Sequence, residues 1–155
     1  MSCPMHIYVD ADACPVKEEV YRVARRYALR VTLVANAPQR IPDDERFDLV
    51  VVREGLDVAD DWIAEHAGAE DIVITADIPL AARCIRNGTR VIGTTGRPFT
   101  EDNVGGALAT RDILSELRGA GEFTSGPPPF EKRDRSRFLQ ALDSAIQATR
   151  QRMLS

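Results

Sequence analysis

The sequence predicts an α/β fold, a three-layer arrangement in which helices flank a parallel sheet of about five strands. Short β-branched runs alternate with amphipathic segments along the chain, which is the pattern of strand–helix–strand units. Residues 49–52 are apolar without interruption, as expected for a parallel strand covered on both faces. Two further strands end at an acidic residue that precedes a proline-opened helix. These three observations predict the fold class.

The first part of the chain contains three predicted strands and two predicted helices. A strand at residues 7–9 leads into a helix from Pro15, which suits the first helical position, to about Ala28. Strands at residues 31–35 and 49–52 follow, on either side of a polar loop with two prolines. The apolar stripe of the second helix consists of Ala59, Trp62, Ile63, His66 and Ala67.

The next elements complete the sheet. A strand at residues 72–75 precedes a helix that Pro79 opens and Gly88 ends, and a strand at residues 90–93 follows. Strands that alternate with helices give a parallel sheet with right-handed crossovers, and the strand order that we expect is 3-2-1-4-5. With that order the sheet reverses direction between the first and fourth strands, where open α/β sheets bind their ligands.

The C-terminal third is expected to begin with a loop at residues 94–99. Thr100 is a suitable cap for a helix from residue 101 to about residue 118. A Gly- and Pro-rich linker over residues 119–129 then leads to an amphipathic helix over residues 135–150. The inward residues of this helix are predicted to be Phe138, Leu142, Ala145 and Ile146.

This organisation corresponds to one α/β domain with a tail. The α/β domain covers residues 1–118, and residues 119–155 are the linker and the C-terminal helix, which is expected to pack on the same domain. The oligomeric state does not follow from the sequence.

Composition and charge exclude several classes of protein. The net charge of −4 is not that of a dedicated nucleic-acid binder. From residue 127 onward, however, the sequence contains six basic and three acidic residues. The sequence has no run of about 18 apolar residues and no secretory leader pattern, so we expect a cytoplasmic protein without a membrane span. Three distant cysteines without C-x-x-C spacing are expected to be reduced thiols.

Aspartates gather at three of the predicted strand-to-helix turns. Clustered carboxylates raise one another's pKa unless a cation lies among them, and hard oxygen ligands suit Mg²⁺ or Mn²⁺. Such a metal would activate water and neutralise charge on a phosphoryl group. The competing interpretation is that each aspartate caps a helix, most of all Asp60 and Asp61. The candidate acids are Asp10, Asp12, Asp57, Asp60, Asp61 and Asp77.

Polar residues around the end of the fifth strand are candidate phosphate contacts. Thr94, Thr95, Arg97 and Asn103 offer hydroxyls, a guanidinium and an amide at a position suited to phosphate, although an ordinary loop explains them equally well. The arginine-rich tail could follow a nucleic-acid backbone, but a solvated helix face is the simpler interpretation.

Cysteine and histidine residues offer a second kind of chemistry. Cys14 is expected at a helix start, where the dipole lowers a thiol pKa, but neither His6 nor His66 is placed as its base. We therefore interpret Cys14 as a small buried residue and both histidines as structural.

Five stretches of the chain resemble a known family. They are residues 9–16 (VDADACPV), 34–36 (VAN), 57–61 (DVADD), 74–81 (ITADIPLA) and 126–128 (GPP) followed by 133–135 (RDR). In this order they resemble the YaiI/YqxD family of bacterial proteins. The resemblance implies a PIN-like fold, whose better-known members are Mg²⁺- or Mn²⁺-dependent ribonucleases with clustered acids at the carboxyl ends of parallel strands.

Carried over to this sequence, the resemblance implies a set of acids. Asp10 would be the acid after the first strand and Asp77 the acid after the fourth. Asp57, Asp60 or Asp61 would be the acid of the helix between them, and the resemblance leaves this choice open.

The hypothesis is that one or two metal ions, held by Asp10, Asp77 and an acid near Asp61, direct water at an RNA phosphodiester. Asp12 and Asp57 are further candidate ligands. Asp12, with Cys14, is a feature of the YaiI/YqxD group rather than of nucleases in general.

Two other classes of function stay open. The motif Asp10-Ala11-Asp12 is similar to the nucleophile motif of haloacid-dehalogenase-like phosphatases, which also need a downstream lysine. The lysines here are Lys17 and Lys132, which are poorly placed for that role and for a receiver domain. The third class is a non-catalytic metal- or RNA-binding protein, although interleaved aromatic residues are missing.

Overall fold

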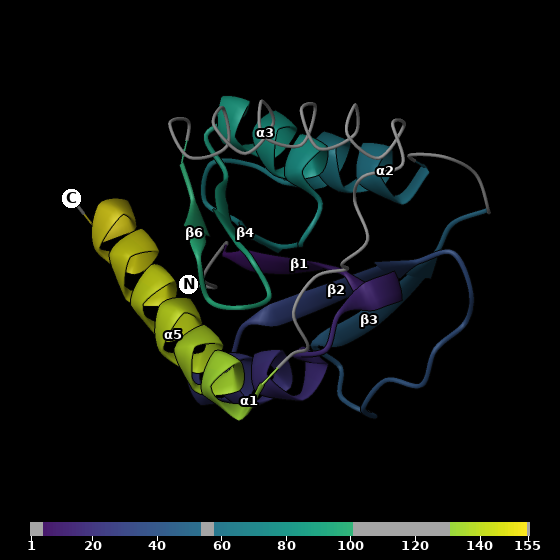
Figure 1. Ribbon diagram of the computed structural model, residues 1–155, viewed down its shortest axis with the longest axis horizontal. Coiled ribbons are helices and arrows are strands. Elements are labelled where there is room, and N and C mark those ends of the chain that lie inside the picture. Colours follow the sequence, from purple (N-terminus) through teal and green to yellow (C-terminus); the bar gives the residue numbers. More distant parts are fainter. Residues whose placement is uncertain (1–4, 54–57, 101–130, 155) are drawn as a thin grey trace, which may run out of the picture.

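The computed structural model describes residues 5–53, 58–100 and 131–154, which form a sheet between two helical layers (Figure 1). The sheet has six strands in the order β3-β2-β1-β4-β5-β6. The first five strands are parallel, and β6 is antiparallel to β5. The predicted order 3-2-1-4-5 is therefore confirmed. The strands are β1 His6–Asp10, β2 Arg30–Ala35, β3 Phe47–Val51, β4 Ile72–Ile74, β5 Arg90–Ile92 and β6 Pro98–Phe99.

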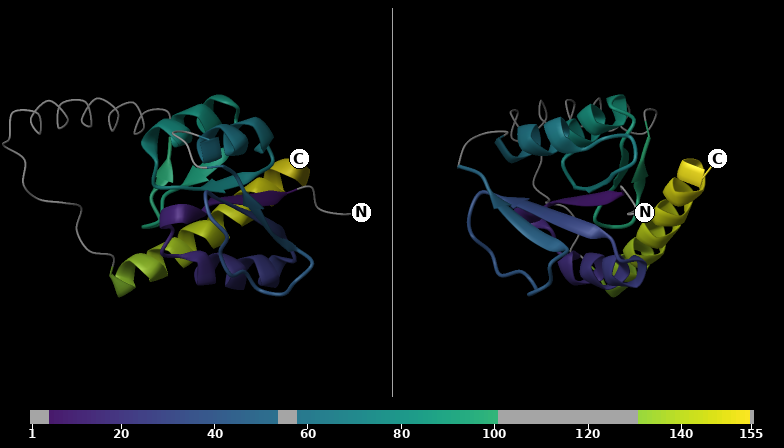
Figure 2. Two further views of the ribbon diagram at one scale, coloured as in Figure 1. Left: turned by 90° about the vertical axis from the view of Figure 1, so that its right-hand side faces the viewer. Right: turned by 180° about the vertical axis from the view of Figure 1, so that it is seen from behind.

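The helices cover both faces of the sheet. The views in Figure 2 show α1 and α5 on one side and α2 and α3 on the other. No helix within the described residues is long and apolar enough to cross a membrane. The helical elements are η1 Ala11–Ala13, α1 Lys17–Tyr27, α2 Val58–His66, α3 Ile78–Arg86 and α5 Lys132–Leu154.

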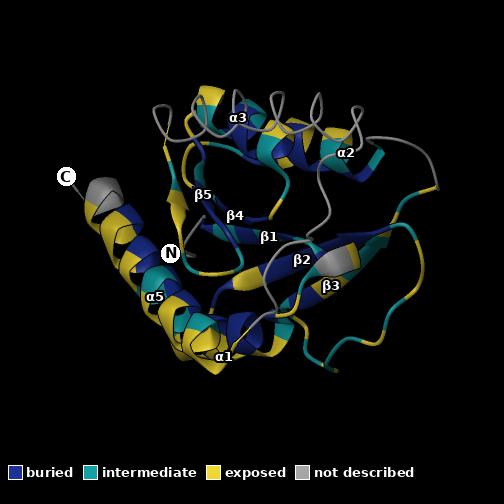
Figure 3. Ribbon diagram, in the orientation of Figure 1, coloured by how far each residue is buried: buried dark blue, intermediate teal, exposed yellow. Residues whose placement is uncertain are grey.

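Side-chain alternation along β1 assigns its residues to the two layers. Ile7 and Val9 are fully buried on the side of α1 and α5, whereas His6, Tyr8 and Asp10 are half-buried on the side of α2 and α3. Figure 3 shows the buried residues concentrated in the sheet and on the inner sides of the helices.

The C-terminal helix α5 completes the core on the α1 side. The four residues predicted to point inward are all buried, and they belong to the same apolar cluster as β1, β2 and α1. Polar contacts add to this packing, because the hydroxyl of Tyr27 in α1 donates a hydrogen bond to Asp143 in α5. The inward residues of α5 are Phe138, Leu142, Ala145 and Ile146.

Several boundaries differ from the sequence expectation. The first helix begins at Lys17 rather than Pro15, because η1 and a turn follow β1 and Val16 is the residue before the helix. The loop expected at residues 94–99 contains β6, which is too short to show an alternating pattern. Helix α5 extends beyond residues 135–150 at both ends.

The expected helix over residues 101–118, the linker over residues 119–129 and the domain boundary between residues 118 and 119 lie outside the described residues.

Candidate functional site

Two acidic residues meet at the carboxyl edge of the sheet, where β1 and β4 end side by side. Parallel pairing places Val9 opposite Ile74. Asp10, the last residue of β1, therefore lies beside Thr75, the residue that follows β4. The Thr75 hydroxyl donates a hydrogen bond of 2.9 Å to Oδ2 of Asp10 and accepts one of 3.0 Å from the backbone N–H of Asp77. Thr75 therefore connects the two acids.

Asp77 also caps α3, as the competing interpretation expects for an aspartate before a helix. Its Oδ1 accepts a 2.9 Å hydrogen bond from the backbone N–H of Leu80, and Pro79 lies in the first turn. Oδ2 of Asp77 and Oδ1 of Asp10 receive no hydrogen bond from a described residue. Among the described residues, one oxygen of each carboxylate is thus without a hydrogen-bond donor.

The electrostatic environment of Asp10 is unfavourable for its negative charge. Burial raises the pKa of the Asp10 carboxyl, and the charges of Asp77 and Asp12 act in the same direction, against the hydrogen bond from Thr75. No lysine or arginine in the described part of the chain forms an ion pair with Asp10 or Asp77. The pair of carboxylates is therefore not neutralised by the described side chains.

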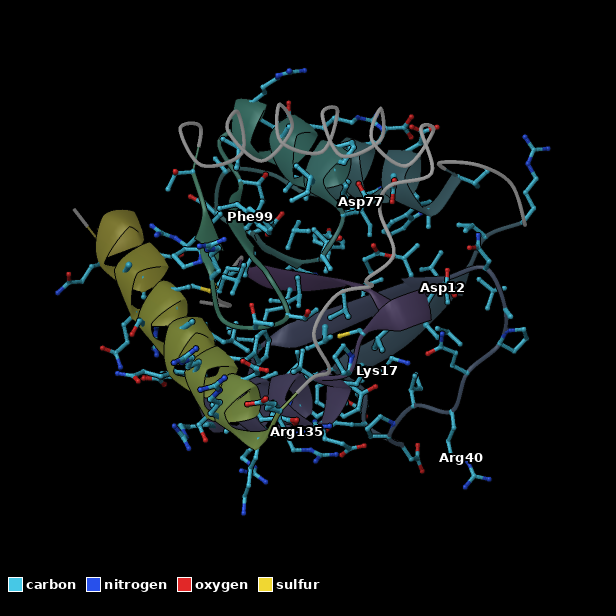
Figure 4. All side chains as sticks on the ribbon, in the orientation of Figure 1. Asp12, Lys17, Arg40, Asp77, Phe99 and Arg135 are labelled. Carbon is cyan, nitrogen blue, oxygen red and sulfur yellow. The ribbon has the colours of Figure 1, made fainter. Side chains whose placement is uncertain are left out.

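Asp12 has a different set of contacts, to the loop after β2. Both of its carboxylate oxygens accept from the backbone N–H of Asn36 at 3.1 Å, and the Asn36 side chain donates to the carbonyl of Arg53. Nearby, Lys17 donates to Gln39 of the same loop. Figure 4 shows Asp12 in η1 and Lys17 at the start of α1. Asp12 therefore ties the turn after β1 to the loop after β2.

Asp61 of α2 has its partner in α3 rather than at this pair. Asp61 forms an ion pair of 2.6 Å with Arg83 of α3, and this hydrogen bond raises the pKa of the Arg83 guanidinium. Asp60 is half-buried in the same helical turn. The acids that act on Asp10 are Asp77 and Asp12 rather than Asp61. Asp57 lies outside the described residues.

The donor set is suited to a cation that brings other ligands with it. Within the described residues, no group of three or more His, Cys, Asp or Glu side chains is placed to hold a metal ion. Asp10 and Asp77 supply two carboxylates. Mg²⁺ commonly takes one or two protein carboxylates and completes its shell with water and substrate phosphates. The two acids fit a site of that kind.

The candidate phosphate contacts lie in the turn between β5 and β6. The backbone N–H of Gly93 donates a 2.8 Å hydrogen bond to the carbonyl of Arg97, which closes the turn. Thr94 is half-buried in it, and Thr95 and Arg97 are exposed. Asn103 lies outside the described residues.

Cys14 and the two histidines have structural surroundings. Burial raises the pKa of the Cys14 thiol to about 11, which outweighs the lowering expected at a helix start. The Nε2 atom of His6 lies 2.6 Å from the Thr32 hydroxyl, and Nδ1 of His66 lies 2.7 Å from the carbonyl of Trp62. These contacts agree with a structural role for all three residues.

The family model described as "Uncharacterized BCR, YaiI/YqxD family" matches residues 8–148 of the chain. The chain belongs to the YaiI/YqxD family. The UPF0178 protein of Azorhizobium caulinodans is 57% identical over 143 residues, which cover 92% of this chain and 90% of that protein. The UPF0178 protein of Rhodospirillum rubrum is 55% identical over 147 residues, or 94% of this chain and 98% of that protein. The resemblance found in the sequence is confirmed.

Thr75 is a residue of the candidate site that the sequence pattern does not predict. The pattern places it at the end of the fourth strand, whereas the structure shows its hydroxyl bonded to both acidic residues. The signal was present, because Thr75 is a buried polar residue at the end of an apolar run and stands two positions before Asp77.

Proposed function

We propose that this YaiI/YqxD protein hydrolyses RNA phosphodiester bonds with Mg²⁺ or Mn²⁺ bound at Asp10 and Asp77. The observation that carries the proposal is a pair of carboxylates, joined through Thr75, that no described cation neutralises. The pair lies at the carboxyl edge between β1 and β4, where the strand order reverses. The resemblance to PIN-like ribonucleases supports RNA as the substrate.

Each residue has a defined part in this proposal. Asp10 and Asp77 would hold the metal through the oxygens that receive no hydrogen bond from described residues, and Thr75 fixes the orientation of Asp10. The bound metal would activate water and offset the charge that develops on the phosphoryl group. Asp61 is a further candidate acid, which Arg83 holds in this structure.

The contacts of Lys17 favour hydrolysis by water over a phosphatase that uses Asp10 as its nucleophile. That second mechanism needs a lysine beside the nucleophile. Lys17 donates to Gln39 instead, and Asp10 receives its hydrogen bond from Thr75.

The test is the loss of metal-dependent cleavage in conservative variants. Cleavage of a fluorescent single-stranded RNA is measured with Mn²⁺, with Mg²⁺ and with EDTA. Asp10→Asn and Asp77→Asn should each lose at least about 100-fold, the upper range for losing an outer-shell partner of a metal. Asparagine still caps a helix, so Asp77→Asn keeps α3 intact. Calorimetric titration of Mn²⁺ should show weaker binding in both variants.

Asp48→Asn is the matched control, because Asp48 is exposed near the amino end of β3 and undergoes the same change of charge. It should cleave like the unmodified protein. Full metal-dependent cleavage by Asp10→Asn would refute the proposal.

A further inference from the structure

The first turns of α5 lie at the same end of the sheet as Asp10 and Asp77. In the left view of Figure 2, η1 and the beginning of α5 lie at one end of the molecule, and the start of β1 lies at the other. Arg135 fixes this position, because its Nη1 donates to the carbonyl of Pro15 at 2.8 Å and to Glu19 at 2.7 Å. The start of α5 is therefore held against the turn after β1.

The other side of α5 contacts the turn after β5. Gly96 has a φ of +87°, and a Cβ atom there would lie 2.6 Å from the carbonyl carbon of Arg137. The two backbones are thus in direct contact, which only glycine permits. This turn is linked to the candidate site, since the backbone N–H of Thr75 donates to the carbonyl of Ile92 in β5.

Two arginines lie where the turn after β5 contacts α5, a place that we call the junction, and both are available for a ligand. Arg97 and Arg137 are both exposed, and neither forms an ion pair with a described residue. Phe138 is fully buried, which fixes the rotation of α5 and turns Arg137 outward. Arg133 lies one turn earlier on the same exposed face and pairs with Glu131. The junction therefore presents guanidinium groups at the same end of the sheet as Asp10 and Asp77.

We propose that Arg97 and Arg137 bind phosphates of a single-stranded RNA that neighbour the phosphodiester at Asp10 and Asp77. This inference rests on the proposed function and defines its substrate as a polynucleotide rather than a phosphomonoester or mononucleotide. Guanidinium groups bind phosphate with two parallel hydrogen bonds and keep their charge at every physiological pH. A local cationic pair also explains how a chain of net charge −4 could attract a polyanion to a site of clustered acids.

The experiment measures strand binding without hydrolysis. Fluorescence anisotropy of a labelled oligouridylate is recorded in EDTA over a range of salt concentrations. The double variant Arg97→Gln, Arg137→Gln should bind about 10-fold more weakly at low salt, and its log–log salt slope should fall by about 1.4, since each contact on a single strand contributes about 0.7. Each single variant should show about half of the change in slope.

Arg86→Gln is the matched control. Arg86 is the last residue of α3, is exposed and lies at the opposite edge of the sheet. It should leave affinity and slope unchanged. The inference is overturned if the unmodified protein does not bind the strand, if the double variant binds equally well, or if Arg86→Gln weakens binding to the same extent.

A second readout separates this inference from the proposed function. Binding in EDTA reports the arginines alone, whereas cleavage in Mn²⁺ reports Asp10 and Asp77. Normal binding by Asp10→Asn, combined with weak binding by the double variant, supports the inference whatever the cleavage result. Loss of cleavage in Asp10→Asn with unaltered binding in the double variant supports the proposed function and refutes the inference.

Discussion

The two faces of the sheet differ in the size and polarity of the side chains that they bury. The face under α1 and α5 is filled by large apolar residues such as Leu33, Phe138 and Leu142, all without exposed surface. The face under α2 and α3 is filled largely by small residues, among them Ala59 and Ala81. Packing on the first face is therefore expected to provide more of the stability.

The polar side chains of β1 belong to the α2–α3 face, whereas Arg90 of β5 lies on the other face and donates to Thr149 of α5. His6, Tyr8 and Asp10 alternate with buried aliphatic residues along β1, and Thr32 and Thr75 occupy the corresponding positions on β2 and after β4. The α1–α5 face therefore stabilises the fold, and the α2–α3 face carries the candidate site. Changes on the two faces should have separable effects.

Removing the largest inner side chain of α5 should have the largest effect on stability. Phe138→Ala should lower the free energy of unfolding by about 3–5 kcal/mol, because a fully buried ring is lost and a cavity remains. Trp62→Ala on the other face should cost only about 1–2 kcal/mol, since Trp62 is half-exposed. Urea denaturation measures both. Equal losses would contradict the division between the faces.

Alkylation of the two described cysteines measures whether burial raises the thiol pKa to the same extent on both faces of the sheet. Burial raises the pKa of Cys14, next to the α1 side, and of Cys84 in α3 to about 11. At pH 8 the thiolate fraction should be about 100-fold below that of a thiol with the ordinary pKa of 9.0, so alkylation should be slower by at least this factor. Iodoacetamide labelling of a Cys3→Ser variant, followed by mass spectrometry, measures the rates.

The same variant in urea provides the reference, since both thiols should then react at the ordinary rate. Rapid labelling of Cys14 in the folded protein would instead indicate a reactive cysteine near the carboxyl edge of the sheet.

A small loss of stability, similar to that of Trp62→Ala, is expected from removing the hydroxyl that links the two acids. Thr75→Val leaves the N–H of Asp77 and an oxygen of Asp10 without their partner, which should cost about 1–2 kcal/mol of folding free energy. Thr95→Val, at an exposed position in the turn after β5, should change stability by less than about 0.5 kcal/mol. Urea titration of both variants gives the comparison, and equal stabilities would show that the hydroxyl contributes nothing.

Local pattern was sufficient to predict most of the fold. The strand order agrees with the order expected for an open α/β sheet, and the five parallel strands and the inward residues of α5 followed from apolar periodicity. The strand β6 did not, because two residues beginning with Pro98 carry no periodic signal and pair only through the turn closed at Gly93 and Arg97. The start of α1 was misplaced because η1 intervenes after Asp10.

The candidate site was predictable only as far as strand order determines it. The proximity of Asp10 and Asp77 follows from the pairing of β1 with β4. The partners of the other acids depend on tertiary contacts, since Asp12 binds a backbone 24 residues away and Asp61 binds Arg83, 22 residues away. No local pattern in the sequence specifies such pairs.

The position of α5 has a consequence for the order of events during synthesis. The ribosome releases β1 and α1 long before α5, and the contact from Arg135 to Pro15 spans 120 residues. Translation at about 5–20 residues per second leaves the apolar side of β1, β2 and α1 without its final cover for several seconds. Folding of this layer can therefore finish only after α5 has been made, and until then its apolar surface is exposed to other chains.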